Sequence, residues 1–175
     1  ITLDETASTF GSLALTGANV AVTENDATEL AASTVSGTFD ITSGGAITNS
    51  GALAITGAST FTNTDGTNDA ITLNNAGNAF TGTVGFTTDS GSAVTVVDTT
   101  ALDLQALTAA SLSVTASGNV SDSGTLAIAG ATTIDAGTGN ITLDEAASTF
   151  GALALTGANV AVTENAAMEL AASTI

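Results

Sequence analysis

Short triplets, in which two large apolar residues flank one small or polar residue, recur along the whole chain. This period-two alternation is typical of β-strands, because successive side chains point to opposite faces and the two apolar residues share one face. Glycine, serine, asparagine and aspartate fill the intervening segments and predict turns. The triplets are Ile1/Leu3, Leu13/Leu15, Val20/Val22, Phe39/Ile41, Leu53/Ile55, Ile71/Leu73, Val94/Val96, Leu112/Val114 and Leu126/Ile128. The pattern predicts an all-β chain.

The chain repeats itself at two levels. Residues 141–175 match residues 1–35 at 30 of 35 positions, the changes being Thr6 to Ala146, Ser12 to Ala152, Asp26 to Ala166, Thr28 to Met168 and Val35 to Ile175. A weaker repeat places an Ile-Thr-Leu start at residues 1, 71 and 141, each followed nine residues later by Phe10, Phe80 or Phe150. We therefore divide the chain into repeat unit 1 (1–70), repeat unit 2 (71–140) and the first half of repeat unit 3 (141–175).

Short strands and short turns at a regular period favour a coil that climbs along one narrow core, with each turn paired to the turns above and below. The predicted fold is a β-solenoid, part of a longer tandem array. Turns of about 18–23 residues would give three or four per 70-residue unit. The spacings of 19 and 22 between Val20, Phe39 and Phe61 fit this range. Residues 70 apart are then expected on the same side of the core. Tandem small β-sandwich domains are the alternative fold.

Composition removes many functions from consideration. The chain has no Lys, Arg, His, Pro, Cys, Trp or Tyr, and its 17 acidic residues give a net charge of −17. Nucleic acids and anionic membrane surfaces would repel it, because binding to them depends on Lys and Arg. No apolar run approaches the length of about 18 residues that a membrane-spanning helix needs, so no membrane insertion is expected. The charge has two interpretations. Either the carboxylates bind or bridge cations, or the charge keeps the protein soluble.

Catalysis is not expected, and no catalytic or cofactor-binding residue is assigned. Nucleophilic triads need His or Cys, and a phosphate-binding loop needs Lys. Only a carboxylate pair could act, as in glycoside hydrolysis. The adjacent pairs Asp4/Glu5 and Asp144/Glu145 are expected to point to opposite faces, because neighbouring side chains alternate along a strand. Their repetition also argues against a unique site.

No metal ligand is assigned either, although one segment resembles an oxygen-rich Ca²⁺ turn. Asp65 and Asp69 flank Gly-Thr-Asn, and the equivalent stretch after Asp135 keeps only one carboxylate. An exposed turn held by an aspartate side chain is the plainer interpretation. Asparagines at turns are expected either to stack as ladders between successive coils or to cap turns; they are Asn25, Asn49, Asn74, Asn75, Asn119 and Asn165.

Residues 71–82 (ITLNNAGNAFTG), residues 44–53 (GGAITNSGAL) and the strands of the LAITGA type resemble the long repeat regions of filamentous-haemagglutinin-like bacterial surface proteins, also called β-strand-repeat proteins. The resemblance covers essentially the whole chain. It implies a right-handed β-helix, export to the cell surface and a role as fibre, stalk or adhesin. The chain departs from such regions by having no Lys or Arg.

These features together predict a structural component of an extracellular fibre, cell-surface filament or matrix. The alternative is the stalk or binding region of a surface adhesin that engages carbohydrate or protein. The expected partners are further copies or neighbouring repeats, with divalent cations as additional candidates. A binding region would need an irregular loop or an aromatic platform, and the repeats offer neither.

Overall fold

Twenty-one short strands form three parallel sheets in a computed structural model that describes residues 1–63 and 65–175. Sheet A has nine strands: β1 (Thr2–Leu3), β3 (Val20–Glu24), β6 (Phe39–Ser43), β9 (Ser59–Asn63), β12 (Thr83–Thr88), β14 (Leu102–Leu104), β17 (Val120–Asp122), β19 (Ile141–Leu143) and β21 (Val160–Val162). Sheet B has eight: β4 (Thr28–Leu30), β7 (Ile47–Asn49), β10 (Ile71–Leu73), β13 (Ala93–Asp98), β15 (Leu107–Ala109), β16 (Ser111–Ala116), β18 (Leu126–Asp135) and β20 (Thr149–Thr156). Sheet C has four: β2 (Thr16–Gly17), β5 (Ser33–Val35), β8 (Leu53–Ile55) and β11 (Ala79–Phe80).

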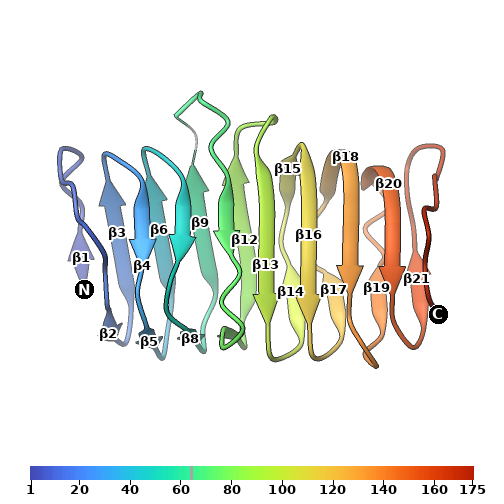
Figure 1. The fold of residues 1–175 in the computed structure, drawn as a ribbon, viewed down its shortest axis with the longest axis horizontal. Coiled ribbons are helices and arrows are strands. Elements are labelled where there is room, and N and C mark those ends of the chain that lie inside the picture. Colours follow the sequence, from blue (N-terminus) through green and yellow to red (C-terminus); the bar gives the residue numbers. More distant parts are fainter. Residues whose placement is uncertain (64) are drawn as a thin grey trace.

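The strands wind into a β-solenoid, as predicted. Each turn contributes one strand to sheet A, so the nine strands of this sheet mark eight successive turns. In Figure 1 the chain rises along the far side, crosses over the top and descends along the near side while it advances from the N-terminus to the C-terminus, which makes the coil right-handed. Every strand pairing between described residues is parallel, for example β3 with β6 and β4 with β7. No helix forms in the described ranges.

The length of a turn varies from one coil to the next. The offset between paired residues in sheet A is 18 residues from Leu104 to Asp122 and 25 residues from Phe61 to Phe86. The predicted spacing of 19 is confirmed, because Val20 pairs with Phe39. The predicted spacing of 22 is wrong: Phe39 pairs with Ser59, and Phe61 pairs with Ile41. The two phenylalanines are diagonal neighbours two positions out of register.

The 140-residue repeat corresponds to a whole number of turns. Strands β1 and β19, which begin the two near-identical segments, lie seven steps apart in sheet A. The 70-residue repeat does not. Strand β10, with Ile71, lies in sheet B, whereas β19, with Ile141, lies in sheet A. The expectation that residues 70 apart lie on the same side is therefore wrong for these strands, because half of seven turns ends on another face.

The cross-section changes along the axis. Sheet C ends at β11, and from β15 onward the chain forms a new corner beside sheet B. Strand β18 turns this corner: its first part pairs with β15 and its second part with β16. The pairing of β18 with β20 shifts register between Ile128 and Ala131, as a bulge at the corner requires.

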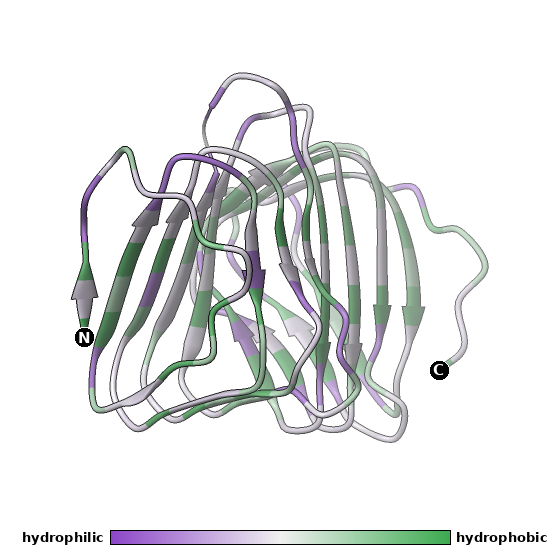
Figure 2. Ribbon diagram, turned by 60° about the vertical axis from the view of Figure 1, so that its left-hand side comes forward, coloured by the Kyte–Doolittle hydropathy of each residue, from purple (hydrophilic) through white to green (hydrophobic). Residues whose placement is uncertain are grey.

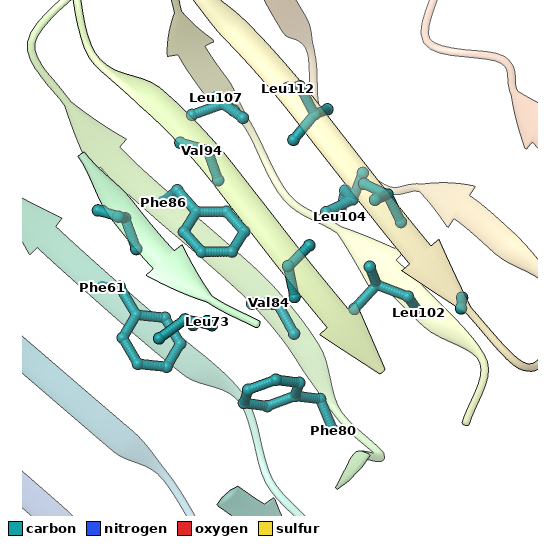
Figure 3. Packing of buried hydrophobic residues seen from close by; sticks show 14 of the residues in the cluster. Phe61, Leu73, Phe80, Val84, Phe86, Val94, Leu102, Leu104, Leu107 and Leu112 are labelled. Atoms are coloured by element: carbon teal, nitrogen blue, oxygen red, sulfur yellow. The ribbon is translucent and has the colours of Figure 1, made fainter. Parts of the chain in front are cut away.

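One continuous hydrophobic core runs from Leu13 to Leu155. Its centre is a group of phenylalanines in which Phe61 contacts Phe39 and Phe80 edge to face and stacks on Phe86, with ring centroids 5.9, 6.1 and 5.8 Å apart. Figure 3 shows Phe61, Phe80 and Phe86 directed into the space between the sheets. Hydrophobic residues recur on successive strands (Figure 2). A single core of this length excludes the alternative of separate β-sandwich domains.

Successive coils approach closely at the turns, where glycine is required. A Cβ atom added at Gly51 would overlap the backbone nitrogen of Ala32 in the preceding coil and lie 2.6 Å from its Cα. Gly124 stands in the same relation to Ala106, whose Cα would lie 2.9 Å away. Gly51 and Gly124 each precede a Leu-Ala-Ile strand, so this repeated motif marks a place where two turns touch through their backbones.

Candidate functional site

Acidic side chains occupy inward-facing positions at the ends of several strands. Glu24 ends β3, Asp98 ends β13 and Asp122 ends β17, and their exposed fractions are 2%, 1% and 6%. Each continues the alternation of the apolar residues before it, as Glu24 continues Val20 and Val22. The pleat of the strand therefore directs these carboxylates into the core.

Two of the buried carboxylates, and that of the partly buried Glu164, accept a backbone hydrogen bond from a repeat-equivalent phenylalanine. The amide of Phe10 donates to Glu24 Oε1 at 2.6 Å, and the amide of Phe80 donates to Asp98 Oδ1 at 3.1 Å. The amide of Phe150 donates to Glu164 Oε1 at 2.8 Å. In each case the carboxylate satisfies the N–H group of a neighbouring coil, which would otherwise be buried without a partner.

Asp98 has the most complete set of partners. Its Oδ1 atom also accepts from the amide of Thr100 at 3.1 Å, and the Thr100 hydroxyl donates to Oδ2 at 3.0 Å. Asp122 is less well satisfied: Oδ1 accepts from the amide of Asp144 at 2.9 Å, while Oδ2 is buried without a partner among the described residues. The Oε2 atoms of Glu24 and Glu164 are likewise buried without a hydrogen-bond partner among the described residues.

No cationic side chain neutralises these groups, because the chain contains no Lys, Arg or His. Burial raises the pKa of Asp98 above its usual value, more than the hydrogen bonds from Phe80 and Thr100 lower it. Burial also raises the pKa of Asp122, and the nearby charge of Asp144 adds to this effect. Asp98 and Asp122 therefore take up protons at a higher pH than an exposed aspartate does.

Acidification is expected to stabilise the fold. A carboxyl group with a raised pKa binds protons more readily in the folded than in the unfolded chain, so the free energy of unfolding rises as pH falls from neutrality toward the ordinary aspartate value of 3.8. Hydrogen bonds from Thr67 lower the pKa of Asp65, which acts in the opposite direction, but this side chain is fully exposed and solvent screens its effect. Thermal unfolding followed by circular dichroism as a function of pH measures the net result.

The variant Asp98→Asn isolates one of these groups. The amide oxygen can still accept from Phe80 and Thr100, while the charge is removed, so the melting temperature at neutral pH is expected to rise by a few degrees. The stabilisation on acidification should shrink. Asp40→Asn is the matched control, since Asp40 is exposed on β6 and the change in net charge is the same. Equal effects of the two variants would mean that overall repulsion, not burial, controls the response to pH.

Uncharged side chains perform the same capping role elsewhere in the solenoid. Asn78 Oδ1 accepts from the amide of Leu53 at 3.0 Å and from Asn49 Nδ2 at 2.7 Å, and Asn78 Nδ2 donates to the carbonyl of Leu73. Ser33 Oγ accepts from the amide of Leu15 at 3.0 Å. Burial of a hydrogen-bonding side chain at strand ends is thus a general device of this fold, and only some turns use a carboxylate.

The predicted asparagine ladder exists at one corner. Asn140 donates its backbone amide to Asn119 Oδ1 at 2.9 Å, and Asn159 Nδ2 donates to Asn140 Oδ1 at 2.8 Å. Of the predicted asparagines, Asn119 takes part in this ladder and Asn49 in the pair with Asn78. Asn75 caps its own turn by accepting from the amide of Gly77. Both predicted roles therefore occur.

The candidate Ca²⁺ turn is held together by its own side chains. Thr67 Oγ1 lies 2.6 Å from both Asp65 Oδ2 and Asp69 Oδ2, and the amide of Thr67 donates to Asp65 Oδ1. The amide of Gly66 donates to Asp89 Oδ2 in the next coil. Asp135 likewise accepts from the amide of Gly137, two residues on. Both segments adopt the aspartate-held turn.

The paired carboxylates Asp4/Glu5 and Asp144/Glu145 lie in turns that follow β1 and β19. The expectation that strand alternation separates them is wrong, because the chain leaves the strand before each pair. Among residues 1–63 and 65–175, no three acidic side chains come together in an arrangement suited to a metal ion. The same residues contain no helix long and apolar enough to cross a membrane.

A shallow groove of about 360 Å³ lies where the cross-section changes. The end of β12, from Phe86 to Thr88, forms one side, and residues 106–108 form the other. Thr88 Oγ1 donates to the carbonyl of Thr108 at 2.8 Å across it. The groove exists because β15 begins the new corner at this level. Phe86 itself is 2% exposed, so the groove presents no aromatic surface.

The sequence predictions did not include the buried carboxylates, although a signal for them was present. The apolar triplets were taken to end at Val22 and Val96, yet the same alternation continues for one more step to Glu24 and Asp98, and Asp122 follows Val120 in the same phase. An acidic residue in phase with the apolar face indicates a buried carboxylate at the end of a strand.

The parallel sheets, the continuous core and the side chains that cap the strand ends together define a tandem-repeat β-solenoid. Residues 17–87 and 91–156 match the family described as Repeats of unknown function (DUF5649), and the chain belongs to this family. No curated protein and no solved structure matches the chain.

Proposed function

We propose that this chain is a structural module of an extracellular fibre, cell-surface filament or matrix, and that it has no enzymatic activity. The observation that carries the proposal is the coincidence of the 140-residue repeat with seven whole turns. Each added repeat begins on the same face as the one before, so the repeats extend a single straight core without a junction defect. A linear element of this kind is suited to spanning distance.

The charge supports a role as a separated fibre. All 17 ionisable side chains are acidic, so neighbouring fibres repel one another along their whole length at neutral pH. The same charge disfavours nucleic-acid binding, and the composition disfavours membrane insertion. The resemblance of residues 44–53 and 71–82 to filamentous-haemagglutinin-like repeats supports a bacterial cell surface as the location.

The length of the fibre is expected to grow in fixed steps. Strand neighbours are separated by about 4.8 Å, so seven turns advance the rod by about 34 Å. Proteins carrying one, two and three 140-residue repeats should form rods whose lengths, measured by electron microscopy and small-angle scattering, differ by this increment. Flexible beads, or lengths that do not grow linearly with repeat number, would refute the fibre proposal.

Divalent cations are proposed to bring fibres together. Ca²⁺ at millimolar concentration is expected to promote lateral bundling by bridging carboxylates on adjacent rods, and light scattering measures it. NaCl at equal ionic strength is the control, because it screens charge over the same distance without bridging. Equal bundling in both salts would mean that charge screening alone causes it, and would refute bridging by Ca²⁺.

A binding region of a surface adhesin is the second candidate function. The groove beside Thr88 and Thr108 favours it, since it interrupts the otherwise regular surface. Binding of the purified chain to a glycan or matrix-protein array, weakened by Thr108→Trp within the groove, would support this function. If the chain binds no glycan and no matrix protein on such an array, the structural role remains the proposal.

A further inference from the structure

The outward side chains of sheet B stack in register into a ladder of hydroxyl groups. The ladder consists of Thr48, Thr72, Thr95, Ser113 and Thr133, each paired with the next on the neighbouring strand. Each residue lies between two buried residues of its own strand, so its side chain points away from the core. We call the outer surface of β7, β10, β13, β16, β18 and β20 the ladder face.

Two further columns of side chains flank the ladder on this face. Small residues lie on one side, among them Ala93, Ser111, Ala131 and Ala152. Larger residues lie on the other side, among them Val97, Thr115, Asp135 and Thr156. Figure 1 looks onto the ladder face, and no other described segment crosses in front of its strands. The face is therefore open to a partner along its whole length.

The ladder face is nearly free of charge on a chain whose ionisable side chains are all acidic. Among the described residues that form its three columns, one carries a carboxylate, Asp135. The outer face of sheet A, by contrast, carries Asp40 on β6 and Asp103 on β14. The described strands of sheet C are uncharged too, but there are only four of them, each two or three residues long. Two copies with a net charge of −17 can thus approach closely over six strands only through the ladder face.

We infer that the ladder face is the interface through which two copies of this chain pair side by side. A hydroxyl group both donates and accepts a hydrogen bond, so the ladder can bond to an identical ladder. A second copy also has the same strand spacing of about 4.8 Å, and the two ladders therefore stay in step along the rod. The pairing goes beyond the proposed fibre, because it depends only on the fold and on where the charges lie.

The flanking columns indicate that the two copies run in the same direction. A two-fold axis parallel to the rod places each ladder residue opposite its own counterpart. It also places the small column of one copy against the larger column of the other, so that the alanines leave room for Val97 and Thr115. An antiparallel pair would set the larger columns against each other and leave a gap between the small ones.

The size of the ladder face sets the strength of the pairing. Six strands about 4.8 Å apart and five residues of about 3.3 Å each give a face of about 500 Å² on each copy. Stable interfaces bury about 800 Å² on each partner. A single chain is therefore expected to pair weakly, and an array with a second 140-residue repeat, which doubles the face, to pair much more tightly.

Sedimentation of the full chain at concentrations up to about 1 mM is the first test. A reversible monomer–dimer equilibrium is expected, and NaCl should strengthen it by screening the acidic residues on the other faces. Thr95→Asp places two like charges opposite each other and should weaken pairing about tenfold or more. Thr42→Asp adds the same charge to the exposed side of β6 and should change it little. A chain that stays monomeric, or equal losses from the two variants, would overturn the proposal.

Cysteine cross-linking tests the face and the direction without adding charge, because the chain contains no cysteine of its own. Thr72→Cys and Thr133→Cys should each form a disulfide-linked dimer with a second copy of the same variant on mild oxidation. Thr42→Cys on sheet A is the control and should not. Equal cross-linking by all three variants would reflect random collision and overturn the proposal. Cross-linking of Thr72→Cys only with Thr133→Cys would show an antiparallel pair and overturn the parallel one.

The mass per unit length of longer arrays separates the pairing from the fibre function. Paired rods have twice the mass per length of a single solenoid, and electron microscopy of unstained arrays measures this quantity. Rods that lengthen with repeat number but keep the mass of one solenoid would overturn the pairing and leave the fibre function standing. Doubled mass without growth in length would do the reverse.

Discussion

Replacement of Phe61 with alanine is expected to lower the free energy of unfolding by about 3–5 kcal/mol, the loss typical of a large aromatic side chain removed from a core. Phe61 is fully buried and contacts Phe39, Phe80 and Phe86, so its ring joins three successive turns of the solenoid. Because each turn is stabilised mainly by its neighbours, a cavity here weakens the connection between the two halves of the rod.

Thermal and urea denaturation measure this effect, with an expected decrease in melting temperature of about 6–20 °C. Phe10→Ala is the control, since Phe10 is only partly buried. Its loss should remove less buried contact and cost much less. Equal losses from Phe61→Ala and Phe10→Ala would contradict the nearest-neighbour account of stability.

Replacement of Gly51 with alanine is expected to cost about 3 kcal/mol or more, because the added methyl group meets backbone atoms that cannot rotate away. The new Cβ would overlap the nitrogen of Ala32, so two adjacent turns would have to separate. Their separation would also strain the hydrogen bond from the Ser33 amide to the Ala52 carbonyl.

Gly11→Ala is a matched control within the same motif. Gly11 precedes Leu13 as Gly51 precedes Leu53, but a Cβ at Gly11 would meet nothing within 4 Å. This variant is expected to be close to neutral in a urea titration. A large loss from Gly11→Ala would show that the glycines serve backbone flexibility and not the close approach of turns.

Much of the fold could be predicted from local alternation. Ile41, Leu53, Leu73, Val96 and Val114 were each assigned to an apolar strand face, and all are buried. The assignment works because the inward face of every strand packs into the same narrow core. Apolar residues therefore recur at every second position along each strand. The near-identity of residues 1–35 and 141–175, at an offset of 140, likewise indicated a repeat architecture before any contact was known.

The register between turns could not be predicted in the same way. Phe39 and Phe61 invited alignment because their side chains are alike, yet Phe39 pairs with Ser59. Turn length depends on how many residues each loop inserts, and polar loops carry no periodic signal. The 70-residue similarity placed Ile71 with Ile1 and Ile141 for the same reason, although Ile71 lies in sheet B.

The candidate site was missed for a different reason. Acidic residues were sought as metal ligands or catalytic pairs, and Glu24, Asp98 and Asp122 were not singled out. In this fold a carboxylate at the end of a strand satisfies the N–H group of a neighbouring coil, so a backbone requirement decides its position. Sequence patterns report side-chain burial more directly than they report backbone hydrogen bonding.

The coincidence of 140 residues with seven turns has a consequence for how such an array changes over generations. Recombination between the stretches of DNA that encode residues 1–35 and 141–175 would delete or duplicate seven turns at once. Every product would keep sheet A in phase across the new junction. A crossover between the weaker 70-residue similarities would instead join a strand of sheet A to the course of sheet B and misalign the core. The length of the array is therefore expected to change in multiples of seven turns.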